Sequence, residues 1–111
     1  MIIDSISSFE LGVLDKIKYT DYIWSLTNYL KAQGVTTLMT HEIHHSMLVT
    51  ELTKHSISFV ADNLILLQYK EVGLEVKKYL RVVKSRSSRH EMNLREYQIT
   101  SDGILISSMK D

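Results

Sequence analysis

The chain has 111 residues, with thirteen Lys and Arg balanced by thirteen Asp and Glu, and it contains neither cysteine nor proline. This length suits one domain with a modest core. Zero net charge provides no overall field for nucleic acid or an anionic membrane, so any basic function must be local. Without cysteine, disulfides and thiolate metal sites are excluded. No apolar run approaches the ~20 residues that span a bilayer, and no signal peptide follows Met1. We therefore expect a cytoplasmic protein with no membrane partner.

The first half of the chain predicts a strand end, a helix and a second strand. Met1 to Ile3 is apolar and stops at Asp4, which is typical of the end of a strand. Apolar and aromatic residues then recur at helical spacing from Tyr19 to Leu30, and Gly34 suits the position that ends a helix. The β-branched run Val35–Thr40 predicts a strand. For residues 41–54 we expect a loop with one helical turn near Met47–Thr53.

The second half predicts strands joined by tight turns. The continuous apolar run Leu64–Tyr69 is typical of a strand buried on both faces. A turn at Gly73 separates it from a long strand, Glu75–Lys84. On that strand Leu80 and Val82 share one parity with three cations, which are Lys78, Lys84 and Arg86. Finally, Asp102-Gly103 is a strong hairpin signal between the predicted strands Arg95–Thr100 and Ile104–Ser107.

Clustered cations end the Glu75–Lys84 strand. Lys84 and Arg86 are two residues apart, so alternation predicts that both side chains point the same way, and Arg89 and His90 follow closely. Such a cluster suits an anion such as phosphate. The alternative interpretation is a solvated basic edge that prevents wrong strand pairing.

Four stretches resemble KaiC-type, RecA-like ATPases, and the resemblance covers nearly the whole chain. They are the basic stretch Val82–His90, the hairpin Arg95–Ile104, the strand Ala61–Tyr69 and the short segment Ile2–Ser5. The resemblance implies an α/β fold, namely a partial RecA-like P-loop ATPase core with a mixed sheet and C-terminal antiparallel hairpins. It also implies ATP and Mg²⁺ as ligands, provided that the missing half of the domain is supplied. It further implies a homo-oligomer, since the family forms hexameric rings.

Carried over residue by residue, the resemblance assigns a set of site residues. Asp4 becomes the Walker B acid that holds magnesium, with Ser5 beside it, and Thr40 becomes a polar sensor at the end of the neighbouring strand. Lys84 and Arg86 become catalytic cations that reach the nucleotide of the next subunit. Lys78, in place of the family's usual arginine, and His90 would lie near that nucleotide. Asp4 as an ordinary strand-end residue and Thr40 as a strand former remain alternatives.

The main departure from the family is a missing phosphate cradle. No G-x-x-x-x-G-K-[ST] loop surrounds any of the four glycines, and the family's paired glutamates are absent. We therefore expect residues 1–111 to be the C-terminal portion of a KaiC/RecA-like ATPase domain, carrying Walker B and the inter-subunit contacts but inactive alone.

Two other classes of function remain open. One is a non-catalytic interaction module that binds a partner or a full-length relative through its sheet edge and basic strand. The other is a nucleic-acid-binding subunit, which zero net charge disfavours. Its candidate contacts are Lys77, Lys78, Arg81, Lys84, Arg86 and Arg89.

Two further motifs carry less weight. His41-Glu42-Ile43-His44-His45 matches H-E-x-x-H, but that zinc chemistry needs a helix, and this segment follows a predicted strand. Ser58-Phe59 occupies the place where KaiC phosphorylates two adjacent hydroxyl residues. Phe59 has no hydroxyl, which argues against a clock-type phosphorylation cycle, and Ser58 is interpreted as a structural serine.

Overall fold

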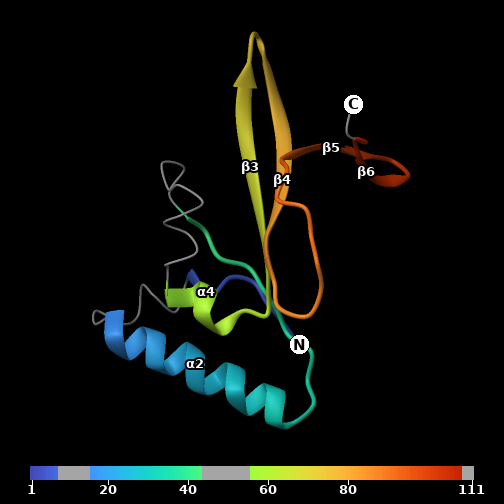
Figure 1. The fold of residues 1–111 in the computed structure, drawn as a ribbon. Coiled ribbons are helices and arrows are strands. Elements are labelled where there is room, and N and C mark those ends of the chain that lie inside the picture. Colours follow the sequence, from blue (N-terminus) through green and yellow to red (C-terminus); the bar gives the residue numbers. More distant parts are fainter. Residues whose placement is uncertain (8–15, 44–55, 109–111) are drawn as a thin grey trace. The chain divides into compact units, whose positions relative to one another are not determined.

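The structure, a computed structural model, describes residues 1–7, 16–43 and 56–108. It divides into two compact units, Met1–Val60 and Ala61–Asp111, and each is described by itself. Figure 1 shows helices in the first unit and an antiparallel sheet in the second. The helical turn expected near Met47–Thr53 lies outside the described residues.

The first unit pairs two short parallel strands beside a long helix. Strand β1 (Ile2–Ile3) pairs with β2 (Leu38–Met39), and Ile2 lies opposite Leu38. Helix α2 (Lys16–Ala32) precedes β2, and a short helix α4 (Ser56–Val60) ends the unit. The predicted strand end and helix are confirmed.

The predicted strand Val35–Thr40 is shorter than expected because its first residues cap the helix. Val35 N donates to Leu30 O at 2.9 Å and Gly34 N donates to Lys31 O at 3.0 Å. Gly34 has a positive φ of 71°, the conformation that ends many helices in this way. The backbone N–H of Val35 therefore belongs to the helix cap and not to the sheet.

A small core holds α2 against the strand pair. Its buried members come from three segments, and Ile3 and Met39 of the two strands pack against them. Tyr19 also donates a hydrogen bond from its hydroxyl to Ile6 O at 3.2 Å. Because a buried tyrosine hydroxyl needs a partner, this bond ties α2 to the segment just after β1. The buried residues are Ile6, Tyr19, Ile23 and Val60.

The second unit is a four-stranded antiparallel sheet in the order β3-β4-β5-β6. Strands β3 (Asn63–Val72) and β4 (Glu75–Ser85) form a long hairpin, seen in Figure 1, whose turn contains Gly73 with a φ of 63°. Strands β5 (Arg95–Thr100) and β6 (Gly103–Ile106) form the second hairpin. The predicted turns at Gly73 and Asp102-Gly103 are confirmed.

A bulge near the end of β4 changes which residues share a face. Ile65 pairs with Val82, but the next residue back, Leu64, pairs with Lys84, so Val83 is extra. Directly opposed residues point to the same face of an antiparallel pair. Lys84 therefore shares the face of Leu64, opposite to the face of Val82. The expectation that Lys84 lies on the same face as Lys78, Leu80 and Val82 is wrong, because simple alternation cannot cross a bulge.

Strand β3 keeps one face exposed, although its composition is typical of a strand buried on both faces. Ile65 and Leu67 are each 61% exposed and Tyr69 is 71% exposed, whereas Leu66 on the other face is buried. Within the described part of the chain, β3 is an edge strand whose one pairing partner is β4. Its composition is that of a central strand, but its environment in this chain is that of an edge.

Helices of membrane-spanning length and hydropathy are not found among the described residues.

Candidate functional site

The first group of candidate residues lies where β1 and β2 end. Parallel pairing places the carboxyl ends of both strands at the same edge of the sheet. There Thr40 donates from Oγ1 to Asp4 Oδ1 at 2.6 Å. Backbone bonds hold the two segments together, from Thr40 N to Ile3 O at 3.1 Å and from Ile6 N to Thr40 O at 2.9 Å. The structure therefore brings the predicted acid and the predicted polar sensor into direct contact.

Serine side chains brace the turn that follows Asp4. Ser5 Oγ accepts a hydrogen bond from Ser7 N at 3.1 Å, and Ser7 Oγ accepts one from Glu42 N at 2.9 Å. The peptide bond between Asp4 and Ser5 is cis. Ser5 thus lies beside Asp4, as predicted, with its hydroxyl engaged by the backbone of the turn.

The oxygen atoms at this edge fit a magnesium ion in kind. Asp4 is exposed, and its carboxylate is oriented by the Thr40 hydroxyl. Magnesium is commonly held by one or two protein carboxylates, with phosphates and water completing its shell. Over residues 1–7, 16–43 and 56–108, His, Asp and Glu form no group of three that could hold a metal. A carboxylate such as that of Asp4 suits magnesium bound together with a nucleotide, whose phosphates supply further oxygen ligands.

The second group lies at the end of β4, in the other unit. Lys84 is in the strand opposite Leu64, and Arg86 is the first residue beyond the strand. Arg86 Nη1 lies 2.7 Å from Asp62 Oδ1 in an ion pair, and Arg86 N donates to Asp62 O at 2.9 Å. The Arg86 and Asp62 side chains are 52% and 45% exposed. The predicted trans-acting arginine is therefore held by a carboxylate of its own chain.

Asp62 is the site residue that the sequence analysis did not identify. One signal pointed toward it, because Asp62 directly precedes β3 while Arg86 directly follows β4, its hairpin partner. Counting back from the turn would pair Asp62 with Ser85, and the extra residue at Val83 advances the pairing to Arg86. Counting along the sequence without the bulge therefore places Ser85, and not Arg86, beside the Asp62 carboxylate.

Lys78 and His90 lie at other positions than the end of β4, where Lys84 and Arg86 are found. Lys78 lies in the middle of β4, opposite Tyr69 on one side and Tyr97 on the other. Six residues of extended strand separate it from Lys84, which is about 20 Å. His90 lies in the segment between β4 and β5, with Nε2 3.1 Å from Met92 Sδ. One phosphate group could not contact Lys78 and Lys84 together.

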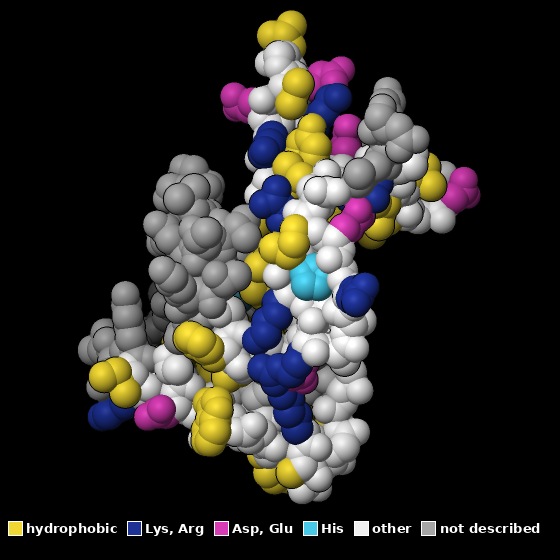
Figure 2. Space-filling model, viewed as in Figure 1, with side chains coloured by type: hydrophobic (Ala, Val, Ile, Leu, Met, Phe, Trp, Pro, Cys, Tyr) yellow, Lys and Arg dark blue, Asp and Glu magenta, His cyan; other side chains and the backbone are white. Residues whose placement is uncertain are grey.

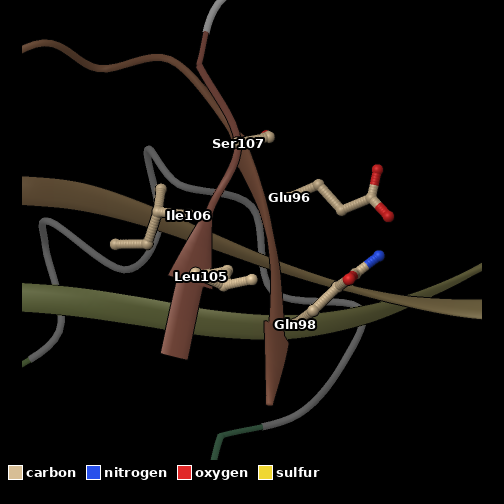
Figure 3. Close-up of a pocket in the computed structure, with 5 residues that line it drawn as sticks. All are labelled: Glu96, Gln98, Leu105, Ile106 and Ser107. Carbon is tan, nitrogen blue, oxygen red and sulfur yellow. The ribbon is translucent and has the colours of Figure 1, made fainter. Parts of the chain in front are cut away.

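An open pocket of about 240 Å³ lies on the β5–β6 hairpin, and none of the predicted site residues lines it. Figure 3 shows Glu96 and Gln98 extending to the same side of β5. Leu105, Ile106 and Ser107 complete its lining. The pocket has no Lys or Arg in its lining, so it offers no cation to a phosphate.

Cations on the β3–β4 hairpin are interleaved with apolar side chains, as Figure 2 shows. Lys77 Nζ lies 3.8 Å from Glu96 Oε2, and Lys70 Nζ lies 5.7 Å from the centre of the Tyr79 ring. Arg86 is also paired with an acid. The cations of the hairpin therefore do not form one continuous positively charged surface. This arrangement favours single anion contacts over a track for a nucleic-acid backbone.

The remaining motifs are partly described. His41, Glu42 and Ile43 follow β2 without helical structure, while His44 and His45 lie outside the described residues. Ser58 is buried in α4 and Phe59 is exposed. A buried hydroxyl agrees with the interpretation of Ser58 as a structural serine.

Known proteins of one family are similar to this chain over most of its length. The family described as ATPase: KaiC matches residues 1–111. The circadian clock oscillator protein KaiC 1 of Synechocystis sp. is 33% identical over 101 residues, which are 91% of this chain and 19% of that protein. KaiC of Parathermosynechococcus lividus is 34% identical over 106 residues, which are 96% of this chain and 19% of that protein.

A solved structure agrees with the sequence comparison. The KaiC-like protein of Pyrococcus horikoshii OT3 matches with a TM-score of 0.74 and 30% identity, covering 96% of this chain and 46% of that one. The expected α/β, partial RecA-like fold is thereby confirmed. The chain spans about a fifth of the length of the curated relatives.

Proposed function

Because the chain belongs to the KaiC family of ATPases, we propose that it supplies the magnesium-holding acid and the trans-acting cations of an ATP site in a ring. The phosphate-binding loop of that site comes from polypeptide outside these 111 residues, since no such loop is encoded within them. The ring is a homo-oligomer in the cytoplasm, and the chain by itself does not hydrolyse ATP.

The contact between Thr40 and Asp4 is the observation that carries this proposal. It joins two residues 36 positions apart at the carboxyl edge of parallel strands, where ligands bind in α/β sheets. Asp4 would hold Mg²⁺, which neutralises charge on the phosphates when it is bound. Thr40 orients the Asp4 carboxylate and, with Ser5, lines the mouth of the site.

Lys84 and Arg86 would contact the terminal phosphate of ATP held by a neighbouring subunit. Both lie at the end of β4, and the guanidinium of Arg86 is half exposed. A cation there stabilises charge that develops during phosphoryl transfer. His90 follows in the same segment and would lie nearby, whereas Lys78 would serve another part of the nucleotide or none.

Mn²⁺, used as a paramagnetic substitute for Mg²⁺, tests the first half of the proposal in a complex that supplies the phosphate-binding loop. With ATP present, Mn²⁺ should broaden the backbone NMR signals next to Asp4 and Thr40, and Asp4→Asn should remove the broadening. Asp21→Asn is the matched control, because it removes the same charge from an exposed position on α2. Equal broadening in the wild type and Asp4→Asn would contradict the assignment of Asp4.

The rate of ATP hydrolysis tests the second half of the proposal, which concerns the external phosphate loop and the trans-acting Arg86. The isolated chain should show no ATP hydrolysis, and any activity that Asp4→Asn abolishes would contradict the need for an external phosphate loop.

In rings that contain such a loop, Arg86→Ala should lower turnover by about 10³-fold while changing ATP affinity much less. Rings that mix Arg86→Ala subunits with subunits defective in their phosphate loop should regain activity. If mixing never restores turnover above either parent, Arg86 does not act in trans.

An interaction module is the second candidate function, and one observation favours it. Apolar side chains on one face of the sheet are exposed in both hairpins, which is unusual for a finished surface. They are Ile65, Leu67, Tyr69, Val76, Ile99, Ile104 and Ile106. A partner or a longer relative would bury them, with or without nucleotide.

A further inference from the structure

Three hydrogen bonds join the residues before β3 to the residues at the end of β4. Asp62 takes part in two of them, accepting from the backbone N–H of Arg86 at 2.9 Å and from its guanidinium Nη1 at 2.7 Å. In the third, Ser85 Oγ donates to Asn63 Oδ1 at 3.2 Å. Ser85 Oγ also lies 2.8 Å from Ser88 Oγ, which links the end of the strand to the following loop.

We propose that Asp62 is a positioning residue for Arg86. It holds the guanidinium in one direction, so that Arg86 meets the terminal phosphate of a nucleoside triphosphate on a neighbouring copy in a preset orientation. This inference rests on the proposed function of Arg86, and it adds a residue that the sequence comparison with the family did not assign.

The geometry supports positioning because Arg86 is attached to Asp62 at two points. The backbone bond secures the base of the residue, and the ion pair secures the tip of its long side chain. A side chain held at both ends has few rotamers left. An arginine that is free in solution loses rotamer entropy when it binds an anion, so holding it beforehand lowers the cost of binding.

Stability alone gives a weaker account of this ion pair. Both side chains are about half exposed, and exposed ion pairs contribute little to folding. A second ion pair in the same unit has similar distances, with Arg95 Nε at 2.7 Å and Nη2 at 2.6 Å from Glu91 Oε1, and its side chains are 21% and 46% exposed. Arg95 also donates to Ser107 O at 3.1 Å, within the sheet. The Glu91–Arg95 pair is therefore a matched control of equal chemistry that does not involve Arg86.

An opposite role for Asp62 is testable with the same variants. If its carboxylate competed with phosphate for Arg86, removing it would strengthen ATP binding. The backbone bond argues for positioning, because it keeps Asp62 next to Arg86 even when the guanidinium turns to another anion. The sign of the change in affinity therefore separates the two roles.

NMR relaxation of the arginine Nε–H groups in the whole chain measures the orientation directly. Asp62→Ala should lower the heteronuclear NOE of Arg86 Nε, and Asp62→Asn should lower it less, since an amide oxygen still accepts a hydrogen bond. Glu91→Ala should change Arg95 and leave Arg86 as it was. An unchanged Arg86 NOE in Asp62→Ala would overturn the positioning role.

ATP titration of rings that contain the phosphate-binding loop, followed by the shift of the Arg86 Nε–H signal, forms the second arm. Asp62→Ala should raise the apparent dissociation constant by about twofold to fivefold, with Asp62→Asn in between and Glu91→Ala unchanged. Tighter binding by Asp62→Ala would overturn positioning in favour of competition. The turnover of mixed rings decides the proposed function of Arg86 by itself, whereas the NOE result decides whether Asp62 orients Arg86.

Discussion

The two units position their candidate residues by different means. In the first unit, strands of only two residues each carry Asp4 and Thr40, and a buried cluster around Ile23 holds them together. In the second unit, β3 and β4 are paired along their whole length, yet many of their apolar side chains stay exposed. Side-chain packing in the core holds Asp4 in position, whereas the backbone pairing of β3 with β4 holds Arg86 in position.

This difference indicates which substitutions should disturb the Asp4–Thr40 edge and which should disturb the hairpin end at Arg86. A cavity in the core of the first unit should disturb the Asp4–Thr40 edge, because little backbone pairing supports it. The hairpin end at Arg86 should instead respond to changes in the turn or in strand register. The following predictions test this contrast, from the largest expected effect to the smallest.

Removing core volume from α2 should have the largest effect. Ile23 is 1% exposed and Ile17, on the same helix, is 73% exposed. Ile23→Ala should lower the free energy of unfolding of the first unit by about 3 kcal/mol, because it leaves a cavity. Ile17→Ala should change it by about 0.5 kcal/mol or less. Urea unfolding followed by circular dichroism measures both, and equal losses would contradict a core centred on Ile23.

The exposed face of β3 should drive self-association of the chain. Leu67 and Gln68 are neighbours on opposite faces of the strand. Leu67→Lys should weaken association by about 1.5 kcal/mol, a dissociation constant about tenfold higher, because it removes apolar surface from the contact. Gln68→Lys adds the same charge to the other face and should have a smaller effect. Sedimentation velocity makes the comparison, and a monomeric wild type at high concentration would contradict the prediction.

The turn of the long hairpin should be sensitive to glycine replacement. Gly73 has a φ of 63°, and an added Cβ there would meet no atom within 4 Å. Gly73→Ala should therefore destabilise the hairpin by about 1 kcal/mol through backbone strain alone. Gly34→Ala introduces the same strain after α2. Hydrogen exchange should show the loss in β3 and β4 for the first variant and in α2 for the second, and the reverse pattern would rule out independent units.

The smallest effect is expected at the Asp4–Thr40 edge. Thr40→Val keeps the shape of the side chain and removes its hydrogen bond, which should cost about 0.5 kcal/mol at an exposed site. Thr36→Val is the control, because Thr36 is exposed and accepts from the N-terminus through its backbone carbonyl. Thermal unfolding measures both variants. If Thr36→Val lowers the unfolding temperature more than Thr40→Val does, the expected contribution of the Thr40 hydrogen bond is contradicted.

Local signals in the sequence predicted most elements of the fold. The spacing of apolar residues with Gly34 predicted α2, and Gly73 and Asp102-Gly103 predicted two hairpins. The nearness of Asp4 and Thr40 was implied by the resemblance to KaiC-type ATPases and not by a local signal, and the structure shows their contact. The helix and the two hairpins depend on residues close in the chain, so a single sequence contains them.

The composition of β3 identifies the strand but not its neighbours. An apolar run indicates which strand prefers burial, but burial requires neighbours on each side and face. Among the described residues β3 pairs with β4 alone, and Ile65 and Leu67 stay exposed. The exposure of these side chains therefore depends on which strands and helices the sheet has beside it.

The sequence by itself determined that cations cluster after a long strand and that an aspartate precedes its hairpin partner. Only the tertiary structure decided which cation meets that aspartate. One extra residue at Val83 moves Lys84 to the other face and brings Arg86, and not Ser85, across from Asp62. The physical reason is that a bulge shifts every later pair by one residue, and its position depends on how two strands twist against each other.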